Sequence, residues 1–141
     1  MWEPLDVILM APNQAGPGSR ALPAWRVLLV EDEAIVRKSL TRQLKHLGLE
    51  VIPVGSGQEA LEAAASALPE VVLSDLAMPG MDGIALARRL RQGYPSLPIV
   101  IMSGNVPEEL QPMLAELNLG RLDKPFGEAE LRQTLGRLLG S

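Results

Sequence analysis

The sequence predicts a doubly wound α/β domain, in which helices cover both faces of a parallel sheet of five strands. Two observations carry this prediction. From Arg26 onward, short apolar runs alternate five times with segments of helical periodicity, and turn-forming residues separate them. Charged side chains directly follow three of the apolar runs, as expected where the carboxyl ends of parallel strands form a ligand-binding crevice.

The predicted strands cover residues 26–30, 50–54, 71–74, 99–102 and 119–122. Each is a short apolar run bounded by charged, glycine or proline residues. Right-handed crossovers between consecutive parallel strands place the first strand toward the centre of the sheet. The carboxyl ends of the first, third and fifth strands are therefore expected to lie close together.

The helix after the first strand is marked by apolar residues at helical spacing. They are Ile35, Val36, Leu40, Leu44 and Leu47. Gly48 follows this stripe and is predicted to end the helix as a C-cap glycine. Two further helices are expected over about residues 57–67 and 83–92, and Asp82 is a good N-cap for the second.

The last two helices should differ in regularity. Pro107 suits a first helical turn, but Pro112 would remove a hydrogen bond from a helix that already ran through it. The helix after the fourth strand is therefore predicted to be short, late-starting or irregular. The final helix carries a regular leucine stripe, formed by Leu131, Leu135, Leu138 and Leu139.

Composition predicts one domain preceded by a tail. A chain of 141 residues, 47% of them hydrophobic, fits a single globular core. Prolines and glycines interrupt every regular pattern before Trp25, so residues 1–24 are interpreted as an N-terminal tail or linker and residues 25–141 as the domain. The apolar stretch at residues 7–11 is too short to span a membrane, and Glu3 and Asp6 stand where a secretory signal needs positive charge. We therefore expect a cytoplasmic protein that does not enter a membrane.

Charge and cysteine content exclude other classes of function. The formal net charge is -4 with both signs scattered along the chain, so direct binding to nucleic acid is not expected. Without cysteine and with His46 as the only histidine, the chain has no disulfide and no thiolate or histidine-based metal site. A bound metal would be held by oxygen, which favours magnesium or calcium.

Three carboxylates and one lysine are expected to meet at the carboxyl edge of the sheet. Glu31 and Asp32 follow the first strand, Asp75 follows the third and Lys124 follows the fifth. Carboxylates crowded into a half-buried crevice repel one another, and a single lysine does not balance them. A divalent cation would balance the remaining negative charge. The residues therefore predict a Mg²⁺ site with Asp32 and Asp75 as direct ligands and Glu31 acting through water.

The order and spacing of four motifs resemble the receiver domains of bacterial two-component response regulators, over about residues 26–139. The motifs are Val30-Glu31-Asp32-Glu33, the stretch from Asp75 to Gly83, Met102-Ser103-Gly104 and Lys124-Pro125-Phe126. The resemblance implies a flavodoxin-like sheet with strand order 2-1-3-4-5. It implies that Asp75 accepts a phosphoryl group and that Mg²⁺ binds Asp32, Asp75 and the backbone carbonyl of Ala77. It also implies that Ser103 and Lys124 bind the phosphoryl oxygens.

The resemblance also implies the partners. The phosphodonor would be a histidine kinase or a histidine phosphotransfer protein, and the signal would leave through an output protein that the sequence does not identify. The chain would catalyse its own phosphorylation and dephosphorylation at Asp75 and would not be a metabolic enzyme. Met102-Ser103-Gly104 resembles receivers of hybrid histidine kinases, so a stand-alone receiver and a piece of such a kinase both stay open. A pseudo-receiver that binds a partner without phosphorylation is the alternative function.

One motif suggests a different ligand. Gly55-Ser56-Gly57 follows a strand and opens a helix, as the turn of a dinucleotide-binding fold does. It follows the second strand of the domain rather than the first, and it leaves Glu31, Asp32 and Lys124 unexplained. We therefore interpret Gly55 and Gly57 as turn and helix-start residues.

Arg121 departs from the pattern of the family. It stands three residues before Lys124, where receivers commonly carry an aromatic side chain that swings inward when the hydroxyl residue engages phosphate. A guanidinium is costly to bury in this way. Our hypothesis is that the switch is muted or uses Ser103 with loop rearrangement alone.

Overall fold

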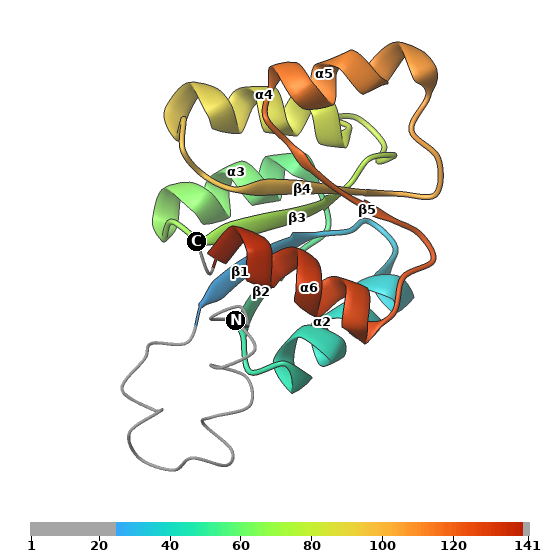
Figure 1. The fold of residues 1–141 in the computed structure, drawn as a ribbon. Helices are drawn as coiled ribbons and strands as arrows, with labels where there is room; N and C mark the ends of the chain where they lie inside the picture. Colours follow the sequence, from blue (N-terminus) through green and yellow to red (C-terminus); the bar gives the residue numbers. More distant parts are fainter. Residues whose placement is uncertain (1–24, 140–141) are drawn as a thin grey trace.

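Five parallel strands form the centre of the fold (Figure 1). They are β1 (Arg26–Val30), β2 (Glu50–Val54), β3 (Val71–Asp75), β4 (Ile99–Ser103) and β5 (Gly120–Asp123). Their order in the sheet is β2-β1-β3-β4-β5, which confirms the predicted fold class and topology. The structure is a computed structural model that describes residues 25–139, so the predicted tail, residues 1–24, lies outside the described residues.

Helices cover both faces of the sheet. They are α2 (Ala34–His46), α3 (Gly57–Ser66), α4 (Gly83–Gly93), α5 (Gln111–Glu116) and α6 (Glu128–Leu139). Helices α2 and α6 lie on one face, and α3, α4 and α5 lie on the other (Figure 1). Among the described residues, no helix is both long and apolar enough to cross a membrane.

The core lies in two layers because successive strand residues point to opposite faces. In β1, Leu28 and Val30 pack toward α3 and α4, whereas Val27 and Leu29 pack toward α2 and α6. Every residue of β3 and β4 is buried, as expected for parallel strands covered on both faces. The edge strands β2 and β5 are partly exposed.

The strand ends differ slightly from prediction. Strands β1 and β2 have the predicted bounds, while β3 and β4 each continue for one more residue, to Asp75 and Ser103. Strand β5 is shifted by one residue and ends at Asp123, so Lys124 follows it directly. Apolar runs underestimate the lengths of β3 and β4, because the hydrogen-bonded pairing of the two strands continues beyond the apolar residues. Asp75 of β3 still pairs with Met102 of β4.

The predicted helix signals are confirmed, with one exception. Gly48 has a positive φ of 91° after α2, and the Asp82 carboxylate accepts a hydrogen bond from the Ala85 amide (2.8 Å) at the start of α4. Ile35 was predicted to belong to the apolar stripe of α2, but it is 84% exposed. It precedes Val36 by one position, a rotation of about 100° that carries it off the stripe formed by Val36, Leu40 and Leu44.

Helix α5 is short and irregular, as its prolines predict. A 3-10 turn, η2 (Glu108–Leu110), precedes it, and Pro112 lies in its first turn, where no intrahelical amide bond is lost. The far end of α5 is held by Arg91 of α4. The Arg91 guanidinium donates to the carbonyls of Leu117 (2.8 Å), Asn118 (3.1 Å) and Leu97, which ties α5 to α4 and to the segment before β4.

Candidate functional site

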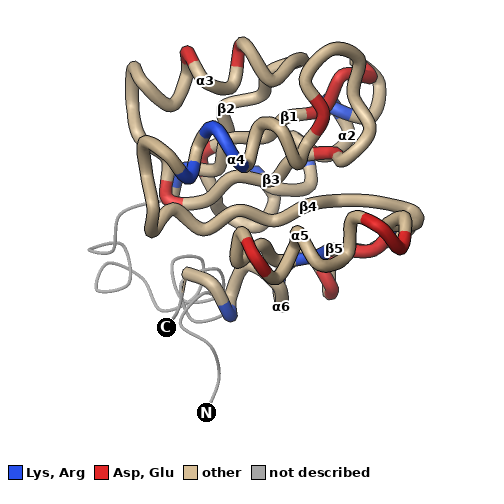
Figure 2. Tube along the Cα trace, turned by 90° about the horizontal axis from the view of Figure 1, so that it is seen from above, with Lys and Arg blue, Asp and Glu red and all other residues tan. Residues whose placement is uncertain are grey.

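The charged residues singled out in the sequence come together at the carboxyl edge of the sheet. Asp75 ends the central strand β3, and Glu31 and Asp32 follow its neighbour β1. Strand β4 separates β5 from β3, yet the Lys124 side chain spans the end of β4 and reaches Asp75. Figure 2 shows acidic segments beside the end of β1 and beyond the end of β4.

Three carboxylates form a tight cluster. Glu31, Asp32 and Asp75 each place one carboxylate oxygen within 4.8 Å of the others. Glu31 is fully buried and Asp75 is 8% exposed. Within the described part of the chain, Oε1 of Glu31 has no hydrogen-bond partner. A buried carboxylate oxygen without a hydrogen bond, beside two further carboxylates, suits a hard divalent cation.

Lys124 supplies positive charge to this cluster. Its Nζ donates a hydrogen bond to Oδ1 of Asp75 (3.0 Å) and lies 3.7 Å from Oε1 of Glu31. Burial by itself lowers the pKa of Lys124, but the hydrogen bond to Asp75 and the charges of Asp75 and Glu31 outweigh it, so the pKa is raised. Lys124 therefore stays protonated at neutral pH.

Burial and the neighbouring carboxylates make the ionised form of Glu31 less favourable. Burial raises the pKa of the Glu31 carboxyl above its ordinary value. The hydrogen bond from the Glu33 amide to Oε2 (3.2 Å) opposes this rise, as does Lys124, whereas the charges of Asp75 and Asp32 add to it. Additional positive charge at the cluster would favour the ionised form of Glu31.

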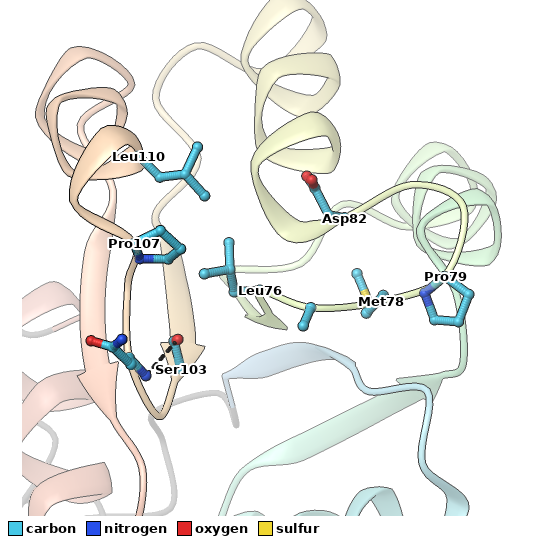
Figure 3. A pocket seen from close by; sticks show the side chains of 9 residues that line it. Leu76, Met78, Pro79, Asp82, Ser103, Pro107 and Leu110 are labelled. Carbon is cyan, nitrogen blue, oxygen red and sulfur yellow. Dashed lines mark hydrogen bonds between the residues drawn. The ribbon is translucent and has the colours of Figure 1, made fainter.

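Ser103 and Ala77 also lie at the carboxyl edge of the sheet, at the end of β4 and just after β3. Both line a cavity of about 550 Å³ between the loop after β3 and the loop after β4 (Figure 3). Its remaining wall is mostly apolar and includes Leu76, Met78, Pro107 and Leu110. Oγ of the buried Ser103 accepts a hydrogen bond from the Asn105 amide (3.1 Å), drawn as a dashed line in Figure 3.

Backbone contacts fix the two loops that carry Asp75 and Lys124. The Lys124 amide donates to the carbonyl of Ser103 (2.8 Å), and the Lys124-Pro125 peptide is cis. Next to Asp75, Gly83 is required by close approach, since a Cβ at this position would lie 2.5 Å from the Asp75 carbonyl oxygen. The Ser74 hydroxyl donates to the same carbonyl (2.9 Å).

Arg37 lies at the site although the sequence did not predict it there, whereas Arg121 is exposed on β5, as the cost of burying a guanidinium suggests. Arg37 was not among the predicted site residues, yet its guanidinium donates to the carbonyls of Glu31 (2.7 Å) and Asp32 (3.4 Å). Its position one turn into the helix after the acidic pair is the available signal. Arg121 lies on exposed β5 and donates to Oδ1 of Asp123 (2.6 Å). Its guanidinium pairs with this carboxylate at the exposed edge of the sheet and not with Ser103 or Asp75.

Sequence comparison identifies relatives of this chain. The profile of the family described as response regulator receiver domain matches residues 27–136. The transcriptional regulator NtrC of Escherichia coli K12 is 40% identical over 103 residues, which are 71% of this chain and 22% of NtrC. The sensor kinase CckA of Brucella abortus is 40% identical over 116 residues, 80% of this chain and 12% of the kinase. The chain thus spans only a minor part of the length of these relatives.

Solved structures agree with the family match. The chemotaxis protein CheY4 of Vibrio cholerae has a TM-score of 0.79 and 31% identity, covering 83% of this chain and all of its own. The receiver domain of the sensor histidine kinase PA1611 from Pseudomonas aeruginosa PAO1 has a TM-score of 0.77 and 28% identity, covering 84% of this chain. That domain was crystallised with a magnesium ion coordinated in its active site cleft. With its strand order, acidic cluster and matching profile, the chain belongs to the response regulator receiver domains of two-component systems.

Proposed function

We propose that this receiver is a phosphoacceptor, in which Asp75 takes a phosphoryl group from a phosphohistidine and the signal passes to a partner protein. The observation that carries the proposal is the contact of Lys124 with Asp75 inside a cluster of three carboxylates. The phosphohistidine would belong to a histidine kinase or a histidine phosphotransfer protein. We also propose a cytoplasmic location, with residues 1–24 as a tail or linker to the domain.

Phosphoryl transfer to a carboxylate needs orientation and charge neutralisation rather than a general base. Lys124 holds Asp75 through Oδ1, so Oδ2 is the oxygen that attacks phosphorus. An O–P bond forms as the P–N bond to the imidazole breaks, and the imidazole nitrogen leaves with the bonding electron pair. Nothing is oxidised or reduced. Dephosphorylation is a separate step, in which the oxygen of water bonds to phosphorus, the O–P bond to Asp75 breaks, and the carboxylate keeps the bonding electron pair while phosphate takes up the protons of the water and leaves.

The remaining residues have distinct roles in this proposal. Asp32, Asp75 and the carbonyl of Ala77 would hold Mg²⁺ directly, and Glu31 would hold it through water. When bound, Mg²⁺ offsets the repulsion between the carboxylate and the anionic phosphoryl group. Lys124 and the Ser103 hydroxyl bind the phosphoryl oxygens. Because Oγ of Ser103 accepts from the Asn105 amide, its own proton is available for donation to the phosphoryl group.

No observation on residues 25–139 favours the pseudo-receiver, since the three acids cluster and Lys124 contacts two of them, Asp75 and Glu31. The two functions are separated by incubating the protein with acetyl phosphate and Mg²⁺ and measuring its intact mass. We expect the mass of one added phosphoryl group, no addition with a chelator, and none for Asp75→Asn. Asp123→Asn is the matched control, because Asp123 is exposed and pairs with Arg121. If the parent protein gained no phosphoryl group under these conditions, the proposal would be wrong.

A further inference from the structure

Arg37 lies beside the main chain of the acidic pair. It is in the first turns of α2, and its Nη1 donates to the carbonyl oxygens of Glu31 (2.7 Å) and Asp32 (3.4 Å). Because both acceptors are backbone atoms, the two carboxylates stay available for other ligands. The Glu31 amide donates to the carbonyl of Val54 (3.1 Å), which ties the same turn to the end of β2.

The turn after β2 leaves room for the Arg37 guanidinium. A Cβ built on Gly55 would lie 3.1 Å from Nη1 and 3.7 Å from Cζ of Arg37. The guanidinium therefore lies against a residue that has no side chain. The Gly55 amide donates to Oε1 of Glu59 (3.0 Å), and the Ser56 hydroxyl accepts from the Glu59 amide (3.1 Å), so this turn is itself fixed to the start of α3.

The second glycine of the turn contacts another loop of the site. A Cβ on Gly57 would lie 2.7 Å from Sδ of Met81, in the loop that follows Asp75. The turn at residues 55–57 thus contacts both the side chain that holds Glu31 and Asp32 and the loop that follows Asp75. This explains the Gly55-Ser56-Gly57 motif by close packing, without a nucleotide.

We propose that Arg37 is a positioning residue for the acidic pair, and that Gly55 provides the space in which its guanidinium is held. By fixing the main chain of Glu31 and Asp32, Arg37 sets the separation between their carboxylates and that of Asp75. The inference rests on the proposed function, since it concerns the Mg²⁺ affinity of that site. It gives Arg37 no contact with the phosphoryl group or with the metal.

Charge and position predict opposite results when Arg37 is removed. If Arg37 acted only through its charge, its loss would remove a cation near a cation site, and Mg²⁺ would bind more tightly. If Arg37 positions the carboxylates, its loss lets the turn relax, and Mg²⁺ binds more weakly. Residues that orient metal ligands typically contribute about 10-fold or more to metal affinity.

The test is a calorimetric titration of the full chain with MgCl₂, without a phosphodonor. We expect Arg37→Met to bind Mg²⁺ about 10-fold more weakly than the parent. Arg42→Met is the matched control, because it removes the same charge from an exposed position of the same helix. It should bind as the parent does or slightly more tightly. With acetyl phosphate, Arg37→Met should need more Mg²⁺ for half-maximal phosphorylation but approach the parent rate at saturating Mg²⁺.

Gly55→Ala provides a second test that preserves every charge. The added methyl group displaces the guanidinium, so Mg²⁺ affinity should fall by a smaller factor than in Arg37→Met. Combining Gly55→Ala with Arg37→Met should weaken binding no further, because both act through one contact. Circular dichroism checks that each variant folds. If Arg37→Met does not fold, the Mg²⁺ affinity of Gly55→Ala tests the role of Arg37 instead.

The outcomes separate this inference from the proposed function. The role of Arg37 is overturned if Arg37→Met binds Mg²⁺ as tightly as the parent or more tightly. If only Gly55→Ala folds, unchanged Mg²⁺ binding by that variant overturns it. Either result leaves the proposed phosphoacceptor function intact. A parent protein that binds no Mg²⁺ overturns the metal site, and the role of Arg37 with it.

Discussion

The acidic cluster and the surface formed by α5 and β5 lie at neighbouring parts of the sheet but are built differently. In the cluster, three carboxylates lie close together, and Lys124 contacts Asp75 and Glu31. On the other surface, α5 is short, Arg91 ties down its far end, and Arg121 pairs with Asp123 in solvent. The comparison indicates that the cluster keeps the acidic residues and the lysine of the family motifs, whereas β5 carries an exposed arginine where receivers commonly carry an aromatic residue.

The largest expected effect is that of Lys124→Met on the cluster. The variant loses the only cation that contacts Asp75 among the described residues, and the transferred phosphoryl group loses a charged partner. We expect phosphorylation by acetyl phosphate to slow by about 100-fold, a typical loss for one charge-stabilising donor. The measurement is the rate of adduct formation by mass spectrometry, with exposed Lys38→Met as control. A rate within a few-fold of the parent would show that Lys124 has no role in transfer.

Arg91→Met tests the other surface. Three carbonyls lose their guanidinium donor, so unfolding free energy should fall by about 2 kcal/mol. Amides near the end of α5 should exchange faster, while phosphoryl uptake stays at the parental level. Chemical denaturation and hydrogen exchange measure these effects, with exposed Arg89→Met as control. Unchanged exchange around Asn118 would argue that α5 is held by its apolar contacts instead.

Glu31→Gln should change the pH dependence of stability. The folded-state pKa of Glu31 is raised, so its contribution to stability is fully present below the unfolded pKa and lost as pH rises through the folded pKa. The neutral glutamine avoids that loss. We therefore expect Glu31→Gln to melt at a higher temperature than the parent at pH 8, with the difference shrinking as the pH falls through the Glu31 pKa. A gain that is the same at all pH values would point to packing rather than charge.

The smallest effect is expected for Arg121. Its pair with Asp123 is exposed, so Arg121→Ala should change unfolding free energy by less than about 1 kcal/mol and leave phosphoryl uptake unchanged. In the parent protein, the Arg121 side chain should stay exposed after phosphorylation. The Nε–H resonance of Arg121, which reports its bond to Asp123, can be followed by NMR with acetyl phosphate and Mg²⁺. A shift of this resonance that reports burial of the Arg121 side chain would contradict the hypothesis that the switch is muted.

The fold could be predicted in detail because its signals are local. Apolar runs locate β1 and β2 to the residue, and the prolines identify the irregularity of α5. The meeting of Asp75 with Glu31, Asp32 and Lys124 also follows from topology, since parallel strands bring their carboxyl ends to one edge. What the residues could not reveal is contact with the main chain. Arg37 and Arg91 both donate to carbonyl groups, which every residue type provides, so side-chain patterns do not identify their partners. For Arg37, only its position one turn into the helix after the acidic pair is a signal.

The close approach of Gly83 to the Asp75 carbonyl limits how this family member can vary. Helix α4 begins against the backbone of Asp75 with no space for a methyl group between them. A residue with a side chain at position 83 would therefore have to move the start of α4 or the end of β3. Ala77 and Asn105, by contrast, are exposed and line the cavity, so burial does not restrict their side chains.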